Sequence, residues 1–250
     1  MIDIHCHILN SIDDGAENLE MSLEMLKTAK DNGVDKVILT PHIKCSDNVS
    51  AFIKKRDELA DVLVSEAAHY NCPEIYKGAE IYIDEEIFYS DIRNLSLNDS
   101  RYVLCEFDFY NFKPVRVEKY LDEIFSDGKL PVFAHPERYD YCQKDWDFIN
   151  YLYEKGVLFQ INAPSLAGLG SAEEFILSYE MVNKQMAAFI GTDAHSDRNR
   201  TTELLKFVSG FPASLNSEYL DYMLNKAPML LLADMDIEDK SIGRIKKRNR

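Results

Sequence analysis

Hydrophobic residues gather along the chain in seven short runs that are rich in Ile, Val, Leu, Phe and Tyr. Runs of this length are typical of buried β-strands, whereas a helix needs a longer periodic segment. The runs are IDIH (2–5), DKVILT (35–40), IYKGAEIYI (75–83), RYVLCEF (101–107), LPVFAH (130–135), VLFQINA (157–163) and AAFIGTDAH (187–195).

Between these runs, apolar residues recur at the three-to-four residue spacing of amphipathic helices. In one such segment Leu19, Leu23, Leu26 and Ala29 share a face, and Gly33 provides the stop signal. Another opens with a capping box, in which a serine is followed three residues later by a glutamate. The predicted helical segments are 18–33, 113–128, 144–156 and 171–185.

Strands that alternate with helices predict an α/β fold with a parallel sheet. No low-complexity linker divides the repeated units, so we expect one domain over residues 1–239 and a separate tail over residues 240–250. Seven strands indicate a TIM-like (β/α)7 barrel, one unit short of eight. In such barrels the chemistry collects at the carboxyl ends of the strands.

The charge of the chain argues against nucleic acid as its main ligand. It has 43 acidic and 28 basic residues, a net charge of −15, and phosphate backbones require a basic surface. The tail holds six of the basic residues and no acid, so residues 1–239 carry 22 basic against 43 acidic residues. A frayed, solubilising end is the simpler interpretation of this tail, and docking on an acidic partner or a membrane surface is the alternative.

The amino terminus and the cysteines indicate a cytoplasmic protein. The first residues lack the basic and apolar pattern of a secretory signal, and no apolar run approaches the length of a membrane span, so an integral membrane protein is not expected. Five cysteines at irregular spacing, without a CxxC motif, suit reduced thiols better than a disulfide framework.

Five of the six histidines fall at or just after the ends of predicted strands: His5, His7, His42, His135 and His195. Any one of them alone is explained as a structural histidine, but five at four strand ends favour a common site. Because side chains alternate along a strand, the two histidines of HCH project to one side while Cys6 projects to the other. The sequence TDAH repeats this spacing with Asp193 and His195.

Carboxylates complete the candidate site. Glu80 and Glu106 lie in strand-like runs, where a buried charge is unfavourable unless it binds a cation. Asp13 and Asp14 follow the first strand, and a turn or cap explains Asp13 equally well. Imidazole and carboxylate donors without cysteine suit manganese, zinc or iron. Nine donors are too many for one ion and suit two or three: His5, His7, Asp14, His42, Glu80, Glu106, His135, Asp193 and His195.

Two arginines add a preference for phosphate. Arg138 follows His135 by three residues, and Arg200 follows His195 by five, so both can reach back over the site. Either arginine alone could be an ordinary surface residue. Beside a metal cluster, the planar guanidinium fork is suited to hold phosphate oxygens. Three divalent ions with four anionic ligands would leave a net charge of about +2, which suits a phosphate dianion.

The motifs DIHCHIL, IDDGA, TPH, GAEI, RYVLCEF, AHPER and TDAH, in this order, resemble the polymerase and histidinol phosphatase (PHP) superfamily. Within it the chain looks like the manganese-dependent protein-tyrosine phosphatases of Gram-positive capsule and exopolysaccharide clusters. The resemblance covers residues 1–232. It implies a distorted seven-stranded barrel and a trinuclear centre at which metal-activated water hydrolyses phosphotyrosine. It also implies a partner, a bacterial tyrosine autokinase with a tyrosine-rich tail.

The resemblance further implies how three ions, most simply manganese, would share the ligands. One ion would take His5, His7, Glu80 and Asp193; a second Glu80, Glu106 and His135; the third Asp14, His42 and His195. Glu80 would bridge the first two ions, and Asp13 would keep a structural role only. Arg138 and Arg200 would be the catalytic phosphate clamps, and no general acid is assigned.

The chain departs from the family pattern at several positions around this centre. Cys6 replaces a usual serine, and Asn10 and Ser11 replace proline and glycine. Pro164 and the pair Thr201–Thr202 also differ, which affects the expected substrate rim rather than the metal ligands.

Three alternatives to a metal-dependent tyrosine phosphatase follow from the sequence. A cysteine phosphatase requires the C-x5-R loop, and no cysteine here has an arginine six positions on, so this class is excluded. Another enzyme of the superfamily, such as a histidinol-phosphate phosphatase or a nuclease, stays possible on sequence alone. So does a metal-bound protein that regulates the kinase without catalysis.

Overall fold

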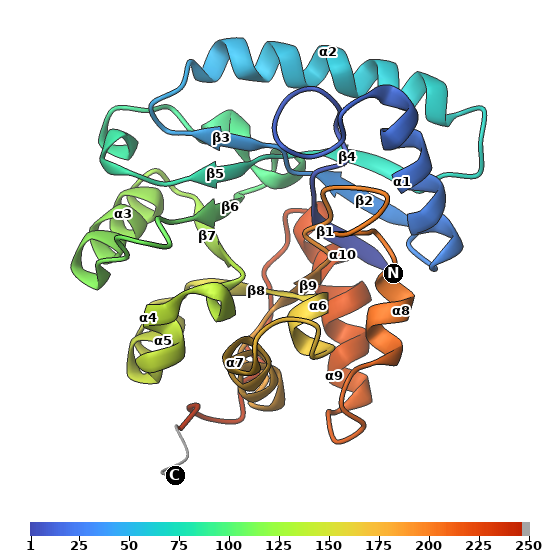
Figure 1. Cartoon of the computed structure of the whole chain (residues 1–250). Coiled ribbons are helices and arrows are strands. Elements are labelled where there is room, and N and C mark those ends of the chain that lie inside the picture. Colours follow the sequence, from blue (N-terminus) through green and yellow to red (C-terminus); the bar gives the residue numbers. More distant parts are fainter. Residues whose placement is uncertain (247–250) are drawn as a thin grey trace.

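The computed structural model describes residues 1–246, and the parallel strands it contains form two sheets (Figure 1). The smaller sheet has the order β1-β2-β4 and the larger has the order β3-β5-β6-β7-β8-β9, with every pair parallel. The strands are β1 (Ile2–Cys6), β2 (Lys36–Leu39), β3 (His42–Lys44), β4 (Glu74–Lys77), β5 (Glu80–Tyr82), β6 (Tyr102–Glu106), β7 (Leu130–Ala134), β8 (Leu158–Asn162) and β9 (Phe189–Gly191). The α/β class with parallel strands is therefore confirmed.

The strands depart from the predicted runs at two places. A further short strand, β3, begins after Pro41, and the single run over 75–83 divides into β4 and β5 at Gly78. A Cβ on Gly78 would lie 2.8 Å from a side-chain carbon of Leu97, so a larger residue here would force the buried Leu97 side chain to shift. The described residues thus contain nine strands in place of seven.

A closed barrel is not confirmed, because the two sheets do not join into one continuous ladder. Their edges nevertheless meet at one point. The backbone N–H of Asp193 donates to His5 O at 2.8 Å, and that of His7 donates to Ala194 O at 2.8 Å. These bonds bring the end of β9 against the end of β1, so the first and last strands share one end of the molecule.

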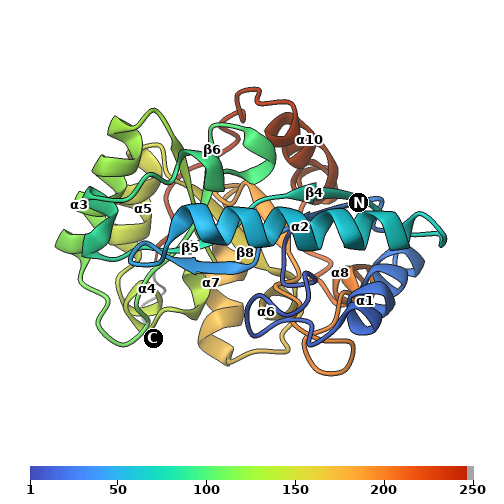
Figure 2. The ribbon, with the colours of Figure 1, turned by 90° about the horizontal axis from the view of Figure 1, so that it is seen from above.

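Helices surround the strands on the outside, and α2 lies across the top of both sheets, as Figure 2 shows from above. Asn18 caps α1 and Ser171 caps α7, where the predicted capping serine accepts from Glu174 N. The helices are α1 (Leu19–Asp31), α2 (Val49–Ala67), α3 (Pro114–Ser126), α4 (Asp140–Lys144), α5 (Trp146–Glu154), α6 (Ala163–Leu166), α7 (Ala172–Asn183), α8 (Leu204–Ser209), α9 (Ser217–Asp221) and α10 (Ala227–Leu232). Single turns are η1 (Glu85–Phe88), η2 (Arg93–Leu95), η3 (Leu97–Asp99), η4 (Pro136–Arg138) and η5 (Tyr222–Lys226).

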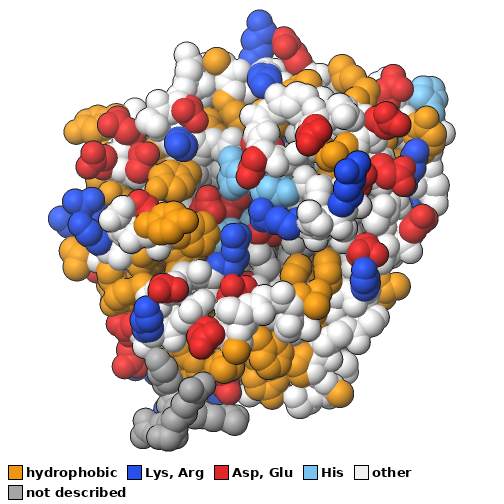
Figure 3. Space-filling model, in the orientation of Figure 1, with side chains coloured by type: hydrophobic (Ala, Val, Ile, Leu, Met, Phe, Trp, Pro, Cys, Tyr) orange, Lys and Arg blue, Asp and Glu red, His pale blue; other side chains and the backbone are white. Residues whose placement is uncertain are grey.

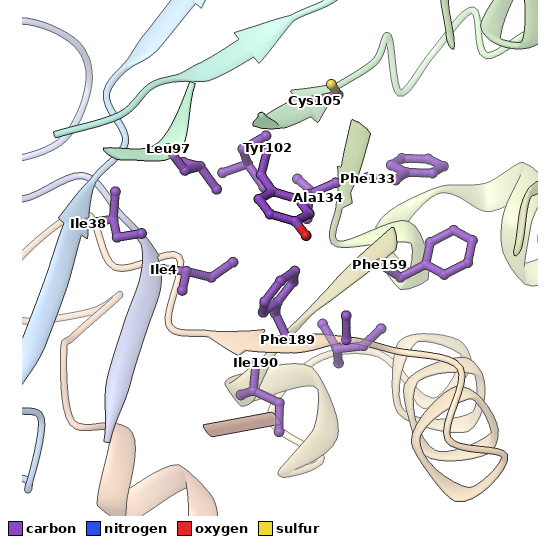
Figure 4. Close-up of a cluster of buried hydrophobic side chains, with 14 of the residues drawn as sticks. Ile4, Ile38, Leu97, Tyr102, Cys105, Phe133, Ala134, Phe159, Phe189 and Ile190 are labelled. Atoms are coloured by element: carbon purple, nitrogen blue, oxygen red, sulfur yellow. The ribbon is translucent and has the colours of Figure 1, made fainter. Parts of the chain in front are cut away.

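The hydrophobic core lies between the strands and extends under the helices (Figure 4). Ile4, Leu97, Tyr102 and Phe189 are fully buried and turn toward a common interior. Phe133 points the other way along its strand, toward the outer layer, as alternation along a strand requires. Because both faces of the sheets are covered, the strands read as nearly continuous apolar runs, and the polar residues within them stand out.

Within the part of the tail that the structure describes, residues 240–246, Arg244 and Ile245 contact α5 and the backbone N–H of Ile242 donates to Lys184 O. Ile245 is 1% exposed, its backbone N–H donates to Asn150 Oδ1, and Asn150 Nδ2 donates back to Ile245 O. Arg244 forms a two-pronged pair with Glu154. The expectation of a frayed end is therefore wrong for these residues, whereas Lys247 to Arg250 lie outside the described part of the chain.

Among residues 1–246, no helix combines the length and apolarity that crossing a bilayer demands.

Candidate metal centre

All nine predicted donors converge at one end of the sheets. Five lie on strands or within two residues of their carboxyl ends: His5 and His7 at β1, Glu106 at the end of β6, His135 after β7, and Asp193 after β9. The other four follow interruptions or loops: His42 opens β3, Glu80 opens β5, and Asp14 and His195 lie in loops. His42 and Glu80 are register partners, so the two strand breaks place two donors side by side.

Glu80 lies at the middle of this cluster and is fully buried. Its Oε2 is 3.0 Å from His5 Nε2, 3.1 Å from His7 Nε2 and 3.2 Å from His42 Nδ1. Its Oε1 is 3.0 Å from His135 Nε2. A carboxylate that meets four imidazoles with both oxygens has the arrangement expected of a bridging metal ligand.

The donor atoms fall into three overlapping groups that could each hold an ion. Within each group the donor atoms lie within 4.8 Å of one another. The group that contains Asp193 (His5, His7, Glu80 and Asp193) equals the set that the family resemblance implies for one ion. The group that contains Asp14 has the implied ligands Asp14, His42 and His195 with His7 in addition. The group that contains Glu106 has His42 in the place where the resemblance implies His135. His135 is nevertheless close, because its Nε2 lies 3.7 Å from Glu106 Oε1. The groups are His5–His7–Glu80–Asp193, His7–Asp14–His42–His195 and His42–Glu80–Glu106.

The chemistry of the donor set fits divalent cations. His5 Nε2 and His7 Nε2 lie 3.3 Å apart. Unless a proton or a cation lies between them, the lone pairs of these two ring nitrogens would repel each other. Burial raises the pKa of Glu106 to about 8, with the Glu80 charge acting in the same direction. A cation would relieve both conflicts, since it attracts lone pairs and favours the ionised carboxylate.

The histidine pKa values diverge within the cluster. Burial lowers the pKa of His135 to about 4 and that of His195 to about 3, which keeps both rings in the neutral, ligating form. Burial acts in the same direction on His7, but hydrogen bonds with Asp13 and Glu80 outweigh it and raise the pKa to about 10. Because metal and proton compete for the ligating nitrogen, metal loading would displace protons from this ring.

Arg138 and Arg200 reach the centre from opposite sides of Asp193. Arg138 donates to Asp193 Oδ2 at 2.9 Å, and Arg200 Nη2 lies 2.6 Å from Oδ1. Their side chains are 34% and 43% exposed, so both guanidinium groups can also face an incoming ligand. The Arg138 guanidinium lies 5.1 Å from the ring centre of Phe109, which in turn stacks on Tyr139.

The substrate rim differs from expectation at Thr202, which is 1% exposed and donates to Met25 O. It supports the underlying loop rather than the rim. Pro164 occupies the first turn of α6, where its missing N–H leaves no bond unmade. Figure 3 shows histidines reaching the surface near the middle of this face, with acidic and basic side chains beside them.

Sequence reasoning missed two polar residues beside the donors, Gln160 and Asn162, which both lie on β8. Gln160 Oε1 is 2.8 Å from His5 Nδ1, and Asn162 Nδ2 donates to Asp193 Oδ2 at 2.8 Å. The signal was present in the run VLFQINA, because two polar residues alternate at the end of an otherwise apolar strand.

A cavity of about 470 Å³ lies at the other end of the strands and is separate from this centre. It is lined by Tyr102 and Leu158, the first residues of β6 and β8. The hydroxyl of Tyr102 donates to Met235 O, and that of Tyr219 donates to Ala187 O. None of the nine donors lines this cavity.

Glu137 is a buried acid behind the centre that the sequence did not single out. Its Oε1 accepts from Asn162 N at 2.8 Å, which ties the turn after β7 to the end of β8. Its Oε2 has no hydrogen-bond partner among the described residues. Burial raises the pKa of Glu137 to about 8, so this side chain is a neutral acid at neutral pH.

We expect Glu137→Gln to stabilise the fold at pH 8 more than at pH 5. The unfolded chain ionises Glu137 near pH 4.5, whereas the folded chain does so near pH 8, so native stability falls as pH rises between these values. The slope is on the order of 1.4 kcal/mol per pH unit. Glutamine keeps the acceptor for Asn162 N and cannot ionise. Urea unfolding of both proteins at pH 5 and pH 8 measures the difference, and Glu173→Gln on the exposed face of α7 is the control. An equal difference at both pH values would contradict the assignment.

Comparisons with known proteins agree in family and fold. The family described as capsular polysaccharide synthesis, CpsB/CapC, matches residues 1–233. Tyrosine-protein phosphatase YwqE of Bacillus subtilis is 32% identical, covering 99% of this chain and 98% of that protein. The putative tyrosine-protein phosphatase CapC of Staphylococcus aureus is 32% identical, covering 92% and 91%.

A solved structure is similar over nearly the same span. It comes from work on YwqE of Bacillus subtilis and CpsB of Streptococcus pneumoniae, described as unique metal-dependent tyrosine phosphatases. The TM-score is 0.84 at 31% identity, over 99% of this chain and 100% of that one. A phosphotriesterase homology protein from Escherichia coli has a TM-score of 0.56 at 10% identity, covering 91% of this chain and 96% of that one, and shows likeness of fold alone.

Proposed function

Because this chain belongs to the CpsB/CapC family of capsular polysaccharide synthesis, we propose that it is a metal-dependent tyrosine-protein phosphatase. The observation that carries the proposal is the buried Glu80 carboxylate surrounded by four histidines, at the end of the sheets where the remaining donors meet. The catalytic domain would span residues 1–239. Its two sheets would form a distorted seven-stranded barrel, in which β2 with β3 and β4 with β5 each count as one interrupted strand.

Three divalent ions, most simply manganese, would occupy this centre. His5, His7, Glu80 and Asp193 would hold the first; Glu80, Glu106 and His135 the second; Asp14, His42 and His195 the third. When bound, the ions supply Lewis acidity and an acidified water for phosphomonoester hydrolysis.

The chain's own contribution is to hold the phosphate. Arg138 and Arg200 present N–H groups over Asp193, where they can bind phosphate oxygens on which negative charge increases in the transition state. The leaving phenol has a pKa of about 10, far below that of an alkyl alcohol, so departure of phenolate needs no strong general acid.

An aromatic wall beside the centre favours a phenyl phosphate. Phe109 lies flat against Tyr139, with ring centres 4.3 Å apart, and stacks on the ring of His135 at 5.7 Å. A phosphotyrosine ring that enters beside Phe109 would bury apolar surface that a phosphorylated alkyl chain fills less well.

The direct test compares hydrolysis of a phosphotyrosine peptide, histidinol phosphate and single-stranded DNA by the manganese-loaded protein. We expect turnover of the peptide at least tenfold faster than of the other two. Faster hydrolysis of histidinol phosphate would replace the proposal with the other branch of the superfamily. Absence of turnover on every phosphotyrosine peptide would favour a regulator without catalysis.

The physiological substrate would be a phosphotyrosine protein, specifically a tyrosine autokinase of capsule or exopolysaccharide synthesis. The family description supports a role in capsular polysaccharide synthesis. Incubation of such a kinase, phosphorylated in vitro, with this protein should remove its phosphotyrosine. The same kinase incubated with protein whose metals have been chelated is the control.

Thiol alkylation should leave the activity unchanged, which separates this enzyme from cysteine phosphatases. Four of the five cysteines are buried, and burial raises the pKa of the Cys45 thiol to about 12. Cys6 Sγ lies 3.3 Å from Ile38 O and faces away from the metal donors. We expect less than a twofold change in rate after iodoacetamide treatment of the folded protein. A cysteine-dependent phosphatase treated in parallel should lose its activity.

A further inference from the structure

In each histidine of the HCH motif, the ring nitrogen that faces away from Glu80 contacts a residue outside the proposed ligand set. His7 Nδ1 lies 2.8 Å from Asp13 Oδ2, and His5 Nδ1 lies 2.8 Å from Gln160 Oε1. The Asp13 side chain is 4% exposed and Gln160 is fully buried. Asp13 thus does more than occupy a turn, which was the role expected from the sequence.

These contacts fix where the ring protons lie. A carboxylate oxygen and an amide oxygen can only accept, so each Nδ1 must carry a hydrogen and donate it. In the neutral ring the lone pair is then on Nε2, the nitrogen that faces Glu80 Oε2 in both His5 and His7. The motif therefore presents two lone pairs to the same point.

The orientation of Gln160 is determined by its other end. Gln160 Nε2 donates to Asn162 Oδ1 at 2.9 Å, and Asn162 Nδ2 donates to Asp193 Oδ2 at 2.8 Å. Reversal of the Gln160 amide would place two donors against each other at His5 and two acceptors at Asn162. The chain of bonds thereby links the HCH motif to Asp193 through β8.

Asp13 is fixed just as firmly. Its Oδ1 accepts from Gly15 N at 3.0 Å, and its Oδ2 also accepts from His42 N at 2.9 Å. A Cβ on residue 15 would lie 2.2 Å from His7 O, so only glycine allows the loop to pass this close to the histidine. By contrast the neighbouring Asp14 side chain is 71% exposed.

We propose that Asp13 and Gln160 are positioning residues that set the tautomer and orientation of His7 and His5 for metal binding. The inference rests on the proposed metal-dependent function and assigns two further residues to it. Partners of this kind usually strengthen metal affinity by about 10-fold to 100-fold. Asp13 adds a negative charge that makes the His7 ring a stronger donor, whereas Gln160 contributes orientation alone.

The test is the affinity of the metal-free protein for Mn²⁺, measured by calorimetric titration and by the metal retained after dialysis. Asp13→Asn keeps the side-chain size and removes the negative charge and one of two oxygens that both accept hydrogen bonds in the native chain. Gln160→Met keeps the approximate size and removes the accepting amide oxygen. We expect each to weaken Mn²⁺ binding by about 10-fold or more, while KM for a phosphotyrosine peptide at saturating Mn²⁺ changes less than threefold.

The matched control is Asp84→Asn, because Asp84 also accepts a backbone N–H, from Glu86, and has no hydrogen bond or ion pair with the nine donors among the described residues. Nitrogen NMR of the zinc-loaded protein provides a second readout, since it distinguishes the Nδ1–H tautomer from the Nε2–H tautomer. Unchanged Mn²⁺ affinity in Asp13→Asn, or in Gln160→Met if the first variant does not fold, would overturn the proposal. If the wild type binds Mn²⁺ but hydrolyses no phosphotyrosine, the proposed function fails while the affinity comparison still decides this inference.

Discussion

Replacement of Glu80 by glutamine should lower kcat/KM for a phosphotyrosine peptide by about 1,000-fold or more. Glutamine has nearly the same shape, but it brings no charge and can offer only one accepting oxygen. In the native chain both Glu80 oxygens are used, Oε2 by His5, His7 and His42 and Oε1 by His135. The amide N–H₂ would face imidazole nitrogens or a cation, and the site would lose the carboxylate proposed to bridge two ions.

Metal content and activity must fall together in this variant. We expect at least one metal ion per chain fewer than in the wild type, measured by elemental analysis after gel filtration. Glu85→Gln, at an exposed position five residues along the chain, is the matched control and should retain both properties. Wild-type metal content with wild-type activity in Glu80→Gln would exclude the bridging role.

The substitution His42→Ala tests whether one proposed ion can be lost while another is retained. His42 is the most exposed of the five candidate histidines, at 31%, and its Nε2 lies 3.7 Å from Asp14 Oδ1. Its loss should remove the ion proposed for Asp14, His42 and His195 and reduce activity, while His5 and Asp193 still help to hold the first proposed ion. Fewer than two ions in the wild type, or full activity in His42→Ala, would contradict a trinuclear centre.

The convergence of the nine candidate donors could be predicted from the sequence because a strand's geometry is regular. Alternation puts His5 and His7 on one side, and the carboxyl ends of parallel strands share one edge, so residues far apart in sequence meet there. The structure places all nine donors in one cluster, although which ion each would hold is a proposal.

The strand interruptions could not be predicted, and they matter for the site. Gly78 divides a run whose composition is that of one continuous strand, and a further strand begins after Pro41, beyond the predicted run 35–40. Only packing against Leu97 and Ile38 shows why the residue at 78 is small. Because each break lies just before a donor, the missed feature is what sets His42 beside Glu80.

The positioning residues were missed for a different reason. Nothing local distinguishes Asp13 from a turn residue. Gln160 does alternate with Asn162 in the run VLFQINA, but that pattern alone does not separate the partner of a metal ligand from a satisfied core amide. Their significance depends on a partner 155 residues away in one case and six in the other. Distances in space, which the sequence does not contain, are required to find such pairs.

Replacement of Arg138 by alanine should lower kcat/KM by about 100-fold to 1,000-fold and leave the metal content unchanged. Arg138 is held between Asp193 and Phe109, so its guanidinium is already oriented when the substrate arrives and little entropy is lost on binding. Asp193 keeps two partners without it, since Asn162 Nδ2 and Arg200 still bind its oxygens. The metal ligands should therefore stay in place.

The variant Arg138→Lys separates the effect of the charge from that of the guanidinium geometry. Lysine restores the positive charge but not the planar fork that can hold two phosphate oxygens. We expect it to recover only part of the lost rate. Arg198→Ala is the control, since Arg198 lies two residues before Arg200 in the same loop and is 82% exposed, with no contact to Asp193 among the described residues. Steady-state kinetics and elemental analysis of all four proteins give the answer. Full activity in Arg138→Ala would show that phosphate is held without this side chain, whereas loss of metal would show that Arg138 acts through Asp193 instead.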